Sequence, residues 1–449
     1  MSNLPVLPRG FYLASVCLTA SCLGLPAAAQ QVLPPESGAL SPCAGEACDA
    51  VPADQSAQSA QEAPSPEATP PEAMPSEAMP SEAPPPEVDI ELVWTQFASA
   101  FDGPHIAPGT NYGGKVDLFA TIDGQALGLG KSVSISVHPE FRYGGDPNAE
   151  IGLLPVNTAL FYPDDDGEQV DLAINVTKSW ASGVSLTVGK LNALDYVAQI
   201  PVQGGGGLSG FRNLGIALPP SAIVPANLTG ALLTVPTDKA IFRLWVYDPY
   251  LQSQRSGFED PFATGVGGLA MVSFPTKIGG KPGLYSLKLT GTTRTGPPGE
   301  ILPAILQPIP GGQWGRQKGT GSVTFSFQQF LEMDKDNPGK GIGIFGQAFL
   351  TDGDPNPLDW SAFFGLSGNI PGRPQDRFGL AYFHYSLSNE LEADLSPFIA
   401  FEDEYGVEAY YTLGLTDWLS ASADVQYVNS SIAVRGNAVI GTFALQTRF

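Results

Sequence analysis

The amino-acid sequence predicts an all-β chain whose strands close into an antiparallel barrel that spans a membrane. Apolar and polar side chains alternate with a period of two along many short segments between residues 88 and 449, as in half-buried strands. Charged residues make up only 15% of the chain, far fewer than a water-exposed surface carries. Beyond residue 30 no segment approaches the roughly 18 consecutive apolar residues of a membrane helix. A closed barrel fits both observations, because it pairs all its backbone groups without helices.

The alternating segments are separated by turn residues. In the clearest runs one parity holds Phe, Tyr, Leu, Val or Ala and the other holds Ser, Thr, Gln, Lys or Asp: residues 285–290, 323–328 and 419–427. Clusters of Gly, Pro, Asp and Asn predict turns at residues 274–283 and 352–357. Each run therefore predicts a strand with one apolar face and one polar face.

A β-sandwich would show the same period, but three further observations favour the barrel. The apolar parity is rich in aromatic residues, as on a lipid-facing surface. The other parity is polar, which suits a water-filled lumen instead of a second packed face. Residues 88–449 also lack the internal repeat of a propeller. Strands of ~10 residues with their connections fit either 16 or 18 strands in this length.

The charge distribution argues against nucleic acid as a partner. The formal net charge is −23, with −9 in residues 1–87 and −14 in the remainder. Phosphate binding requires clustered Lys and Arg, and the chain has no such cluster. The charge of residues 88–449 suggests that anions are disfavoured as solutes, although salt screens charges on exposed loops.

The first 87 residues are predicted to form two segments ahead of the barrel. Residues 1–29 combine Arg9, an apolar stretch from Phe11 and a small-residue site at 27–29, and predict a cleaved secretory signal. Residues 30–87 are rich in Pro, Ala, Glu and Ser and predict a disordered acidic spacer. In an oxidising compartment Cys43 and Cys48 could form a disulfide. The barrel is expected to occupy residues 88–449.

The last segment, residues 437–449, alternates up to a terminal aromatic residue. Phe449, Leu445 and Phe443 share one parity and are expected to face lipid, whereas Arg448, Gln446 and Thr442 are expected to face the interior. Such a strand would close the barrel against the first strand, so that no edge is left in lipid. Its final aromatic residue would also be read by the barrel-assembly machinery.

No motif indicates catalysis, a cofactor or a metal. The pattern GGGLSG at 205–210 is followed by Pro219–Pro220, which prevents the helix that a nucleotide-binding loop needs. DGDPNP at 352–357 has proline where a calcium loop requires glycine. The acidic residues at 164–167 are interpreted as a solvated turn. Three scattered histidines have no metal-ligand spacing, and no nucleophile motif is present.

Several segments resemble the carbohydrate-selective porins of Gram-negative outer membranes, the OprB-type family. They include LLPVNTAL (153–160), VGKLNALD (188–195), the segment 210–232, SGFEDPF (256–262), SFPTKIGGKPG (273–283), DGDPNP (352–357), the segment 370–382, GVEAYY (406–411) and the last strand. The matching segments occur in the same order as in the family and extend over nearly all of residues 90–449. The spacer is not included in the resemblance. It implies a 16-stranded outer-membrane barrel through which small solutes, typically sugars, diffuse.

The candidate solute-binding or constriction residues are polar side chains in or near these segments. They are Glu140, Arg142, Lys190, Asn192, Asp195, Arg212, Asn213 and Arg243, with a second set of Arg373, Asp376 and Arg377. Charged and amide groups can hydrogen-bond sugar hydroxyls and bind weakly enough to permit exit. Two alternatives remain: a porin for solutes other than sugars, and a structural envelope protein that acts through its acidic spacer. Outer-membrane lipid is the expected surrounding, and the chain could be a monomer or a homo-oligomer.

Overall fold

The computed structural model describes residues 88–148, 150–161, 168–204, 207–218, 223–253, 255–300, 302–337 and 339–449. The predicted signal, the spacer with Cys43 and Cys48, and the acidic turn at 164–167 lie outside these residues. None of the described helices has the length and apolar character needed to cross a membrane.

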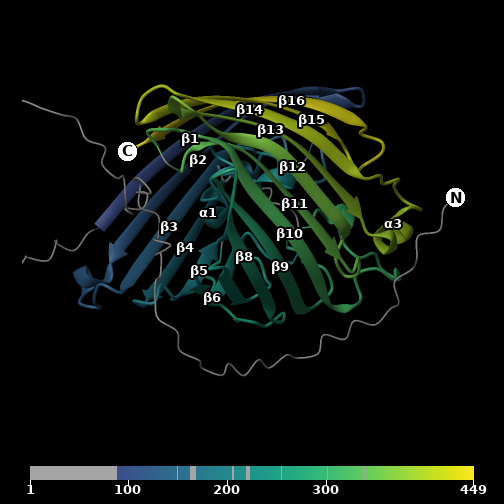
Figure 1. The fold of residues 1–449 in the computed structure, drawn as a ribbon. Coiled ribbons are helices and arrows are strands. Elements are labelled where there is room, and N and C mark those ends of the chain that lie inside the picture. Colours follow the sequence, from purple (N-terminus) through teal and green to yellow (C-terminus); the bar gives the residue numbers. More distant parts are fainter. Residues whose placement is uncertain are drawn as a thin grey trace, which may run out of the picture.

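Sixteen antiparallel strands form one closed barrel, so the predicted fold class is confirmed (Figure 1). Each strand pairs with its neighbours in sequence, and β1 pairs with β16. The strands are β1 Val88–Gly103, β2 Ile106–Asp123, β3 Val133–Gly144, β4 Glu168–Ser179, β5 Ser185–Asn192, β6 Asn227–Pro236, β7 Ile241–Tyr247, β8 Gly267–Ile278, β9 Lys281–Thr295, β10 Lys318–Met333, β11 Gly341–Thr351, β12 Leu358–Ile370, β13 Arg373–Leu387, β14 Glu404–Gly414, β15 Leu419–Asn429 and β16 Asn437–Arg448. This topology settles the strand number at 16 instead of 18.

The two ends of the barrel differ in the length of their connections. At the short-turn end, β8 and β9 are joined by two residues and so are β12 and β13. At the opposite end, long connections follow β3, β5, β7, β9 and β13. The helices are η1 Gly124–Leu127, η2 Thr158–Leu160, α1 Ala193–Ala198, α2 Leu214–Ala217, η3 Ala304–Leu306 and α3 Asn389–Leu395. All except η1 belong to the long-connection end.

The period-two pattern sorts side chains between the outside and the inside of the barrel. On β10, Val323 and Phe325 are 46% and 47% exposed, whereas the intervening Thr324 is buried. On β16, Phe443 and Leu445 face outward as predicted, and Phe449 beyond the strand is also exposed. An apolar outer surface with a polar inner one is the arrangement expected of a barrel in lipid.

The turn predicted at residues 274–283 is shorter than its composition suggests. Only Gly279 and Gly280 lie outside the strands, with φ angles of +58° and +76°. A two-residue hairpin of this kind requires positive φ at both positions, which glycine adopts without steric cost. Pro275 and Pro282 are accommodated within β8 and β9, so proline marks the strand ends here and not the turn itself.

Backbone and side-chain hydrogen bonds close the seam between β1 and β16. The N–H and carbonyl groups of Phe449 pair with those of Leu92 at 2.9 and 3.0 Å. Inside the barrel, the Oγ of Ser99 lies 3.0 Å from Oγ1 of Thr442. Arg448 has the inward parity but lies at the rim, where its Nε is 2.8 Å from the Glu91 carboxylate. The last strand therefore completes the ring of backbone pairing that lipid requires.

Replacing Ser99 and Thr442 by cysteine should produce a disulfide across the seam. The two residues are directly paired and their side-chain oxygens lie 3.0 Å apart, so two cysteines would have a suitable separation. Non-reducing electrophoresis would detect the bond in a variant whose four native cysteines are changed to serine. The control pairs Ser99→Cys with Ala444→Cys, two residues farther along β16. Equal cross-linking of both pairs would contradict this register.

Candidate functional site

Two long connections fold into the barrel and fill part of its interior. We call residues 145–161 and 193–226 the inserted segments. Phe211 is fully buried and packs against Phe345 of β11 and Tyr410 of β14, with ring centroids 5.4 and 4.8 Å away. Ile151 and Ile216 belong to the same apolar cluster. The barrel thus encloses a hydrophobic core, and burial of these side chains holds the inserted segments against β11–β14.

Glu408 of β14 anchors the second inserted segment. Its carboxylate accepts hydrogen bonds from the backbone N–H groups of Arg212 and Asn213, at 2.5 and 3.0 Å. The Asn213 side chain also donates to Gln426 of β15 at 3.1 Å. All four residues are at least 99% buried, and a carboxylate that accepts two backbone N–H groups offsets part of its own desolvation.

The Arg212 side chain crosses to the strands near the seam. Its guanidinium donates to the Ser422 hydroxyl at 2.5 Å, lies 3.9 Å from an Asp424 oxygen and stands over the Phe97 ring at 5.5 Å. Arg212 is fully buried. The predicted residues Arg212 and Asn213 therefore join the inserted segment to the barrel wall.

Arg377 of β13 provides a second anchor. Its Nε donates to the Tyr410 hydroxyl at 3.0 Å. Its Nη2 donates to the carbonyl groups of Pro201, at 3.2 Å, and Gln203, at 3.0 Å, and also to that of Val202. A planar guanidinium can satisfy several carbonyl groups at once, and here it fixes residues 201–203 against the wall.

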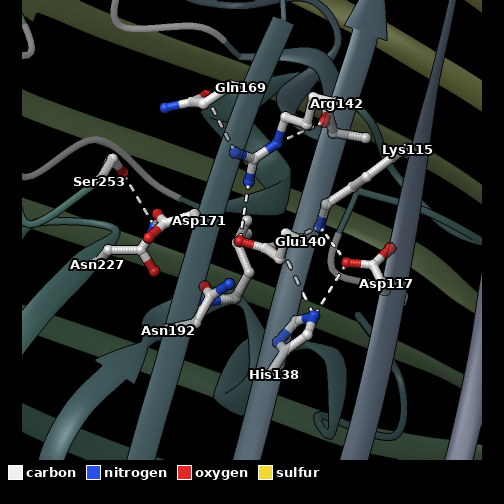
Figure 2. Close-up of polar contacts among 12 residues, drawn as sticks. Lys115, Asp117, His138, Glu140, Arg142, Gln169, Asp171, Asn192, Asn227 and Ser253 are labelled. Carbon is white, nitrogen blue, oxygen red and sulfur yellow. Dashed lines mark hydrogen bonds and ion pairs between the residues drawn. The ribbon is translucent and has the colours of Figure 1, made fainter. Parts of the chain in front are cut away.

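A buried polar network lines the inner face of β2–β5 (Figure 2). Lys115 forms ion pairs with Asp117, at 2.7 Å, and with Glu140. Arg142 donates to Glu140 and Gln169, each at 3.2 Å, and to the Ala159 carbonyl of the first inserted segment at 3.1 Å. Opposite charges on neighbouring strands thus compensate one another where the inserted segment covers them.

The network continues onto β5 and β6. Lys190 donates to Asp171 at 2.6 Å and to the Arg255 carbonyl at 2.7 Å. Asn227 donates to the other Asp171 oxygen at 2.5 Å and to Ser253 at 3.0 Å. Lys190 is 1% exposed, so its ammonium group is hydrogen-bonded to protein groups and shielded from the open interior.

Asn192 and Asp195 position α1. The Asn192 side chain caps the helix by accepting the Leu194 N–H at 3.0 Å. Asp195 lies 3.0 Å from one ring nitrogen of His138, and Asp117 lies 3.0 Å from the other. This chain of contacts connects α1 to β2 and β3.

Asp117, His138 and Glu140 could in principle hold a metal, since their ligand atoms lie within 4.8 Å of one another. However, the Lys115 ammonium contacts both carboxylates. A lysine in that position supplies the positive charge that a metal would otherwise provide. The cluster is therefore an internally neutralised part of the network.

A cavity of about 1610 Å³ remains between the inserted segments and the opposite wall. Its wall includes inward residues of β7–β11, among them Arg243, Trp245, Met271, Lys288 and Gln347. On the facing side, Tyr196 of α1 meets the Trp245 ring edge-on, at 5.2 Å between centroids. The open part of the interior therefore follows β7–β11 and borders the buried polar network at Arg142, Asn192 and Asn227.

The predicted residues divide into four groups by location. Arg142, Asn192 and Arg243 line the cavity. Asp195, Arg212, Asn213 and Arg377 hold the inserted segments in place, and Glu140 and Lys190 belong to the buried polar network. Sequence reasoning did not select Lys288, Trp245 or Tyr196. Lys288 had a usable signal, since it lies on the polar parity of the run 285–290.

Arg373 and Asp376 lie away from the cavity, beside the turn between β12 and β13. They form an ion pair at 2.7 Å, and the Arg373 side chain is 60% exposed. Asp376 also accepts from the Tyr411 hydroxyl at 2.7 Å. Tyr411 belongs to the outward parity of β14, so this pair lies on the outer side of the barrel near the short-turn end.

The other motifs have structural roles in the described residues. Asp352 accepts from Thr320 at 2.5 Å and from the Gly321 N–H at 3.0 Å. Asp354 accepts from the Gly315 N–H at 2.9 Å. Burial, together with neighbouring carboxylates, raises the pKa of Asp354. The glycine motif, described from residue 207, precedes α2, which has only four residues, too short for a phosphate-binding helix.

Glu408→Ala should loosen the second inserted segment while the barrel remains closed. The change removes the acceptor of two buried N–H groups, and we expect limited proteolysis within residues 193–226 to accelerate by about tenfold. Glu332→Ala, at an exposed position of β10, is the matched control. Unchanged cleavage of the Glu408 variant would show that the anchor is dispensable.

Lys115→Met should destabilise the whole barrel. It leaves the Asp117 and Glu140 carboxylates without their shared ammonium, and breaking a buried charge network in this way costs about 3–5 kcal/mol. Urea unfolding in detergent, followed by tryptophan fluorescence, measures the loss. Lys131→Met alters an exposed lysine and should leave the midpoint unchanged; equal midpoints for both variants would contradict the role given to Lys115.

Comparison with known proteins agrees with the resemblance found in the sequence. Residues 247–449 match the family model described as "Carbohydrate-selective porin, OprB family". The high-pH structure of Pseudomonas putida OprB is similar to this chain with a TM-score of 0.66 and 16% identity, covering 81% of this chain and 94% of that one.

Two further solved structures cover the same share of the chain. The low-pH structure of P. putida OprB gives a TM-score of 0.44 and 13% identity, over 81% of this chain and 92% of that one. A loop-deletion mutant of OmpT from Vibrio cholerae gives a TM-score of 0.47 and 13% identity, over 81% of this chain and 99% of that one. No curated protein matches the chain. The predicted resemblance is thus confirmed: residues 247–449 carry the sequence pattern of the OprB family, and the barrel has the fold of the P. putida OprB porin.

Proposed function

We propose that the chain is a bacterial outer-membrane porin through which small hydrophilic solutes, with sugars as the expected class, diffuse passively. The observation that carries the proposal is the cavity of about 1610 Å³ along a partly polar wall inside a closed barrel. The description of the family that residues 247–449 match, carbohydrate-selective porin, supports sugars as the solute. The chain's own chemistry supports a channel, since polar and aromatic groups face the cavity.

The outer surface supports placement in a lipid bilayer. Leu289 and Val425 are more than half exposed, and Phe325 and Phe443 nearly so. Exposing such side chains to water around a whole barrel would be costly, whereas lipid solvates them. The short-turn end would face the periplasm, and the long connections the outside of the cell. Residues 1–29 would be removed on export, and residues 30–87 would tether or space the barrel.

Passage would follow the β7–β11 side of the interior. Ser326, Gln328 and Gln347 line that wall, and their hydroxyl and amide groups can exchange hydrogen bonds with solute hydroxyls. The Trp245 ring offers a flat surface for the C–H face of a sugar. Each contact replaces part of the solute's hydration, and none is strong enough alone to prevent release. The inserted segments limit the width of the path because their apolar core fills the opposite side.

Planar-bilayer recording of the purified protein tests the proposal. We expect discrete conductance steps. Titration with neutral and charged sugars should reduce the current, and this reduction should saturate as the sugar concentration rises. Liposome swelling with a sugar, an amino acid and a dicarboxylate would compare solute classes. Equal rates for all three would indicate a general porin, and the absence of any channel would refute the proposed function.

Ser326→Cys should make the current sensitive to a water-soluble thiol reagent. Ser326 lines the cavity, so a bulky charged adduct there would obstruct the path and reduce conductance by about half or more. Phe325→Cys provides the control, because the neighbouring side chain faces outward and is 47% exposed on the outer surface. If modification of the two variants reduced the current equally, β10 would not border the conducting path.

A further inference from the structure

Two cations on the cavity wall have no compensating group among the described residues. Arg243 of β7 and Lys288 of β9 both line the cavity, and neither forms an ion pair or hydrogen bond with the part of the chain that the structure describes. Lys190 and Arg377, which also point inward, are each held by several protein groups. The difference identifies Arg243 and Lys288 as cations that remain available to a solute.

The strand register places these two cations at one level of the barrel. Arg243 is paired with Met271 of β8, and Met271 is paired with Lys288. Neighbouring strands are about 4.8 Å apart, so the two backbones are separated by about 10 Å. Both side chains are long enough to reach an anion located between them, and Met271, which separates them on the wall, offers no competing charge.

The carboxylates on the cavity wall are already bonded to protein groups. Asp146 lines the cavity and accepts from the Asn148 N–H at 2.6 Å. Glu300 lines the cavity but is paired with both terminal nitrogens of Arg294, at 2.5 and 2.7 Å. Asp195, next to Tyr196 on α1, is 3.0 Å from His138. The wall also includes Arg435 and Arg255, of which Arg255 is paired with Glu259 at 3.5 Å. The cavity therefore has a local excess of positive charge, although the chain as a whole has a net charge of −23.

Groups suited to a polyhydroxy solute adjoin the two cations. Trp245 lies two residues from Arg243 on the same face of β7 and contacts Tyr196 of α1 on the cavity wall. Ser286 lies two residues from Lys288 on β9, and its hydroxyl donates to Ser273 of β8 at 2.8 Å. An aromatic surface and a pair of hydroxyl groups can contact a sugar body while the cations hold its charged group.

We propose that Arg243 and Lys288 form a subsite for the anionic group of an acidic sugar, either a sugar carboxylate or a sugar phosphate. The inference deepens the proposed function and rests on it, because it assigns the solute class of the same pore. Fixed cations on a low-dielectric wall concentrate anions locally. The pore therefore favours anions over cations, contrary to what the net charge alone suggests.

The reversal potential in a salt gradient measures this preference. At low ionic strength, where screening is weak, the wild-type channel should pass chloride in preference to potassium. The double variant Arg243→Gln, Lys288→Gln should lower the chloride-to-potassium permeability ratio by about fivefold or more. Lys239→Gln removes one charge from the exposed turn between β6 and β7 and serves as the matched control. The charge-conserving double variant Arg243→Lys, Lys288→Arg should retain the preference.

Current block by three solutes tests the subsite itself: gluconate, glucose 6-phosphate and glucose. Stronger block by either acidic sugar than by glucose, lost in the glutamine double variant, supports the proposal and identifies the anionic group. Equal block by all three, or a preference unchanged in the double variant, overturns it. If the double variant does not fold, the two single glutamine variants decide in the same way. A wild-type channel without anion preference refutes only the subsite, whereas the absence of channels refutes the porin assignment.

Discussion

Closure of the backbone hydrogen-bond ring is the constraint on which the rest of this structure depends. A strand edge left in lipid would expose unpaired N–H and C=O groups, and each would cost several kcal/mol. The pairing of Phe449 with Leu92 removes the last such edge. Once the ring is closed, every strand has one face toward lipid and one toward the interior, and the period-two pattern follows.

Closure also creates an interior that has to be filled or hydrated. The inserted segments fill part of it with an apolar core around Phe211 and Ile216. Covering a polar wall with these segments would bury charges at a high cost. The wall avoids that cost where Lys115 meets Asp117 and Glu140. Buried charge in this barrel is therefore concentrated where covering segments need firm attachment.

The sequence predicted the fold much better than the site. Alternation shows that Lys190 and Lys288 both point inward, and this was enough to predict the barrel and its two faces. It cannot show that Lys190 is covered and bonded to Asp171 whereas Lys288 faces the cavity. That difference depends on the path of the connection between β7 and β8, whose Arg255 carbonyl accepts a hydrogen bond from Lys190. Such a path is determined by tertiary contacts and not by the strand pattern. The same limitation explains why Arg373 and Asp376 were grouped with Arg377.

Whether a charged side chain is compensated by protein groups distinguishes residues that hold the structure together from residues that face the open cavity. Polarity alone distinguishes them less clearly. Every strand carries polar groups on its inward face, so polarity alone cannot identify the wall of the open cavity. Arg142 lines the cavity, but its guanidinium is held by Glu140, Gln169 and a backbone carbonyl, and its charge acts mainly within the protein. Arg243 and Lys288 lack such partners in the described chain, so their charge extends into the cavity. A net charge averaged over the whole chain therefore says little about the potential inside the cavity, because that potential is determined by the few uncompensated groups on the cavity wall.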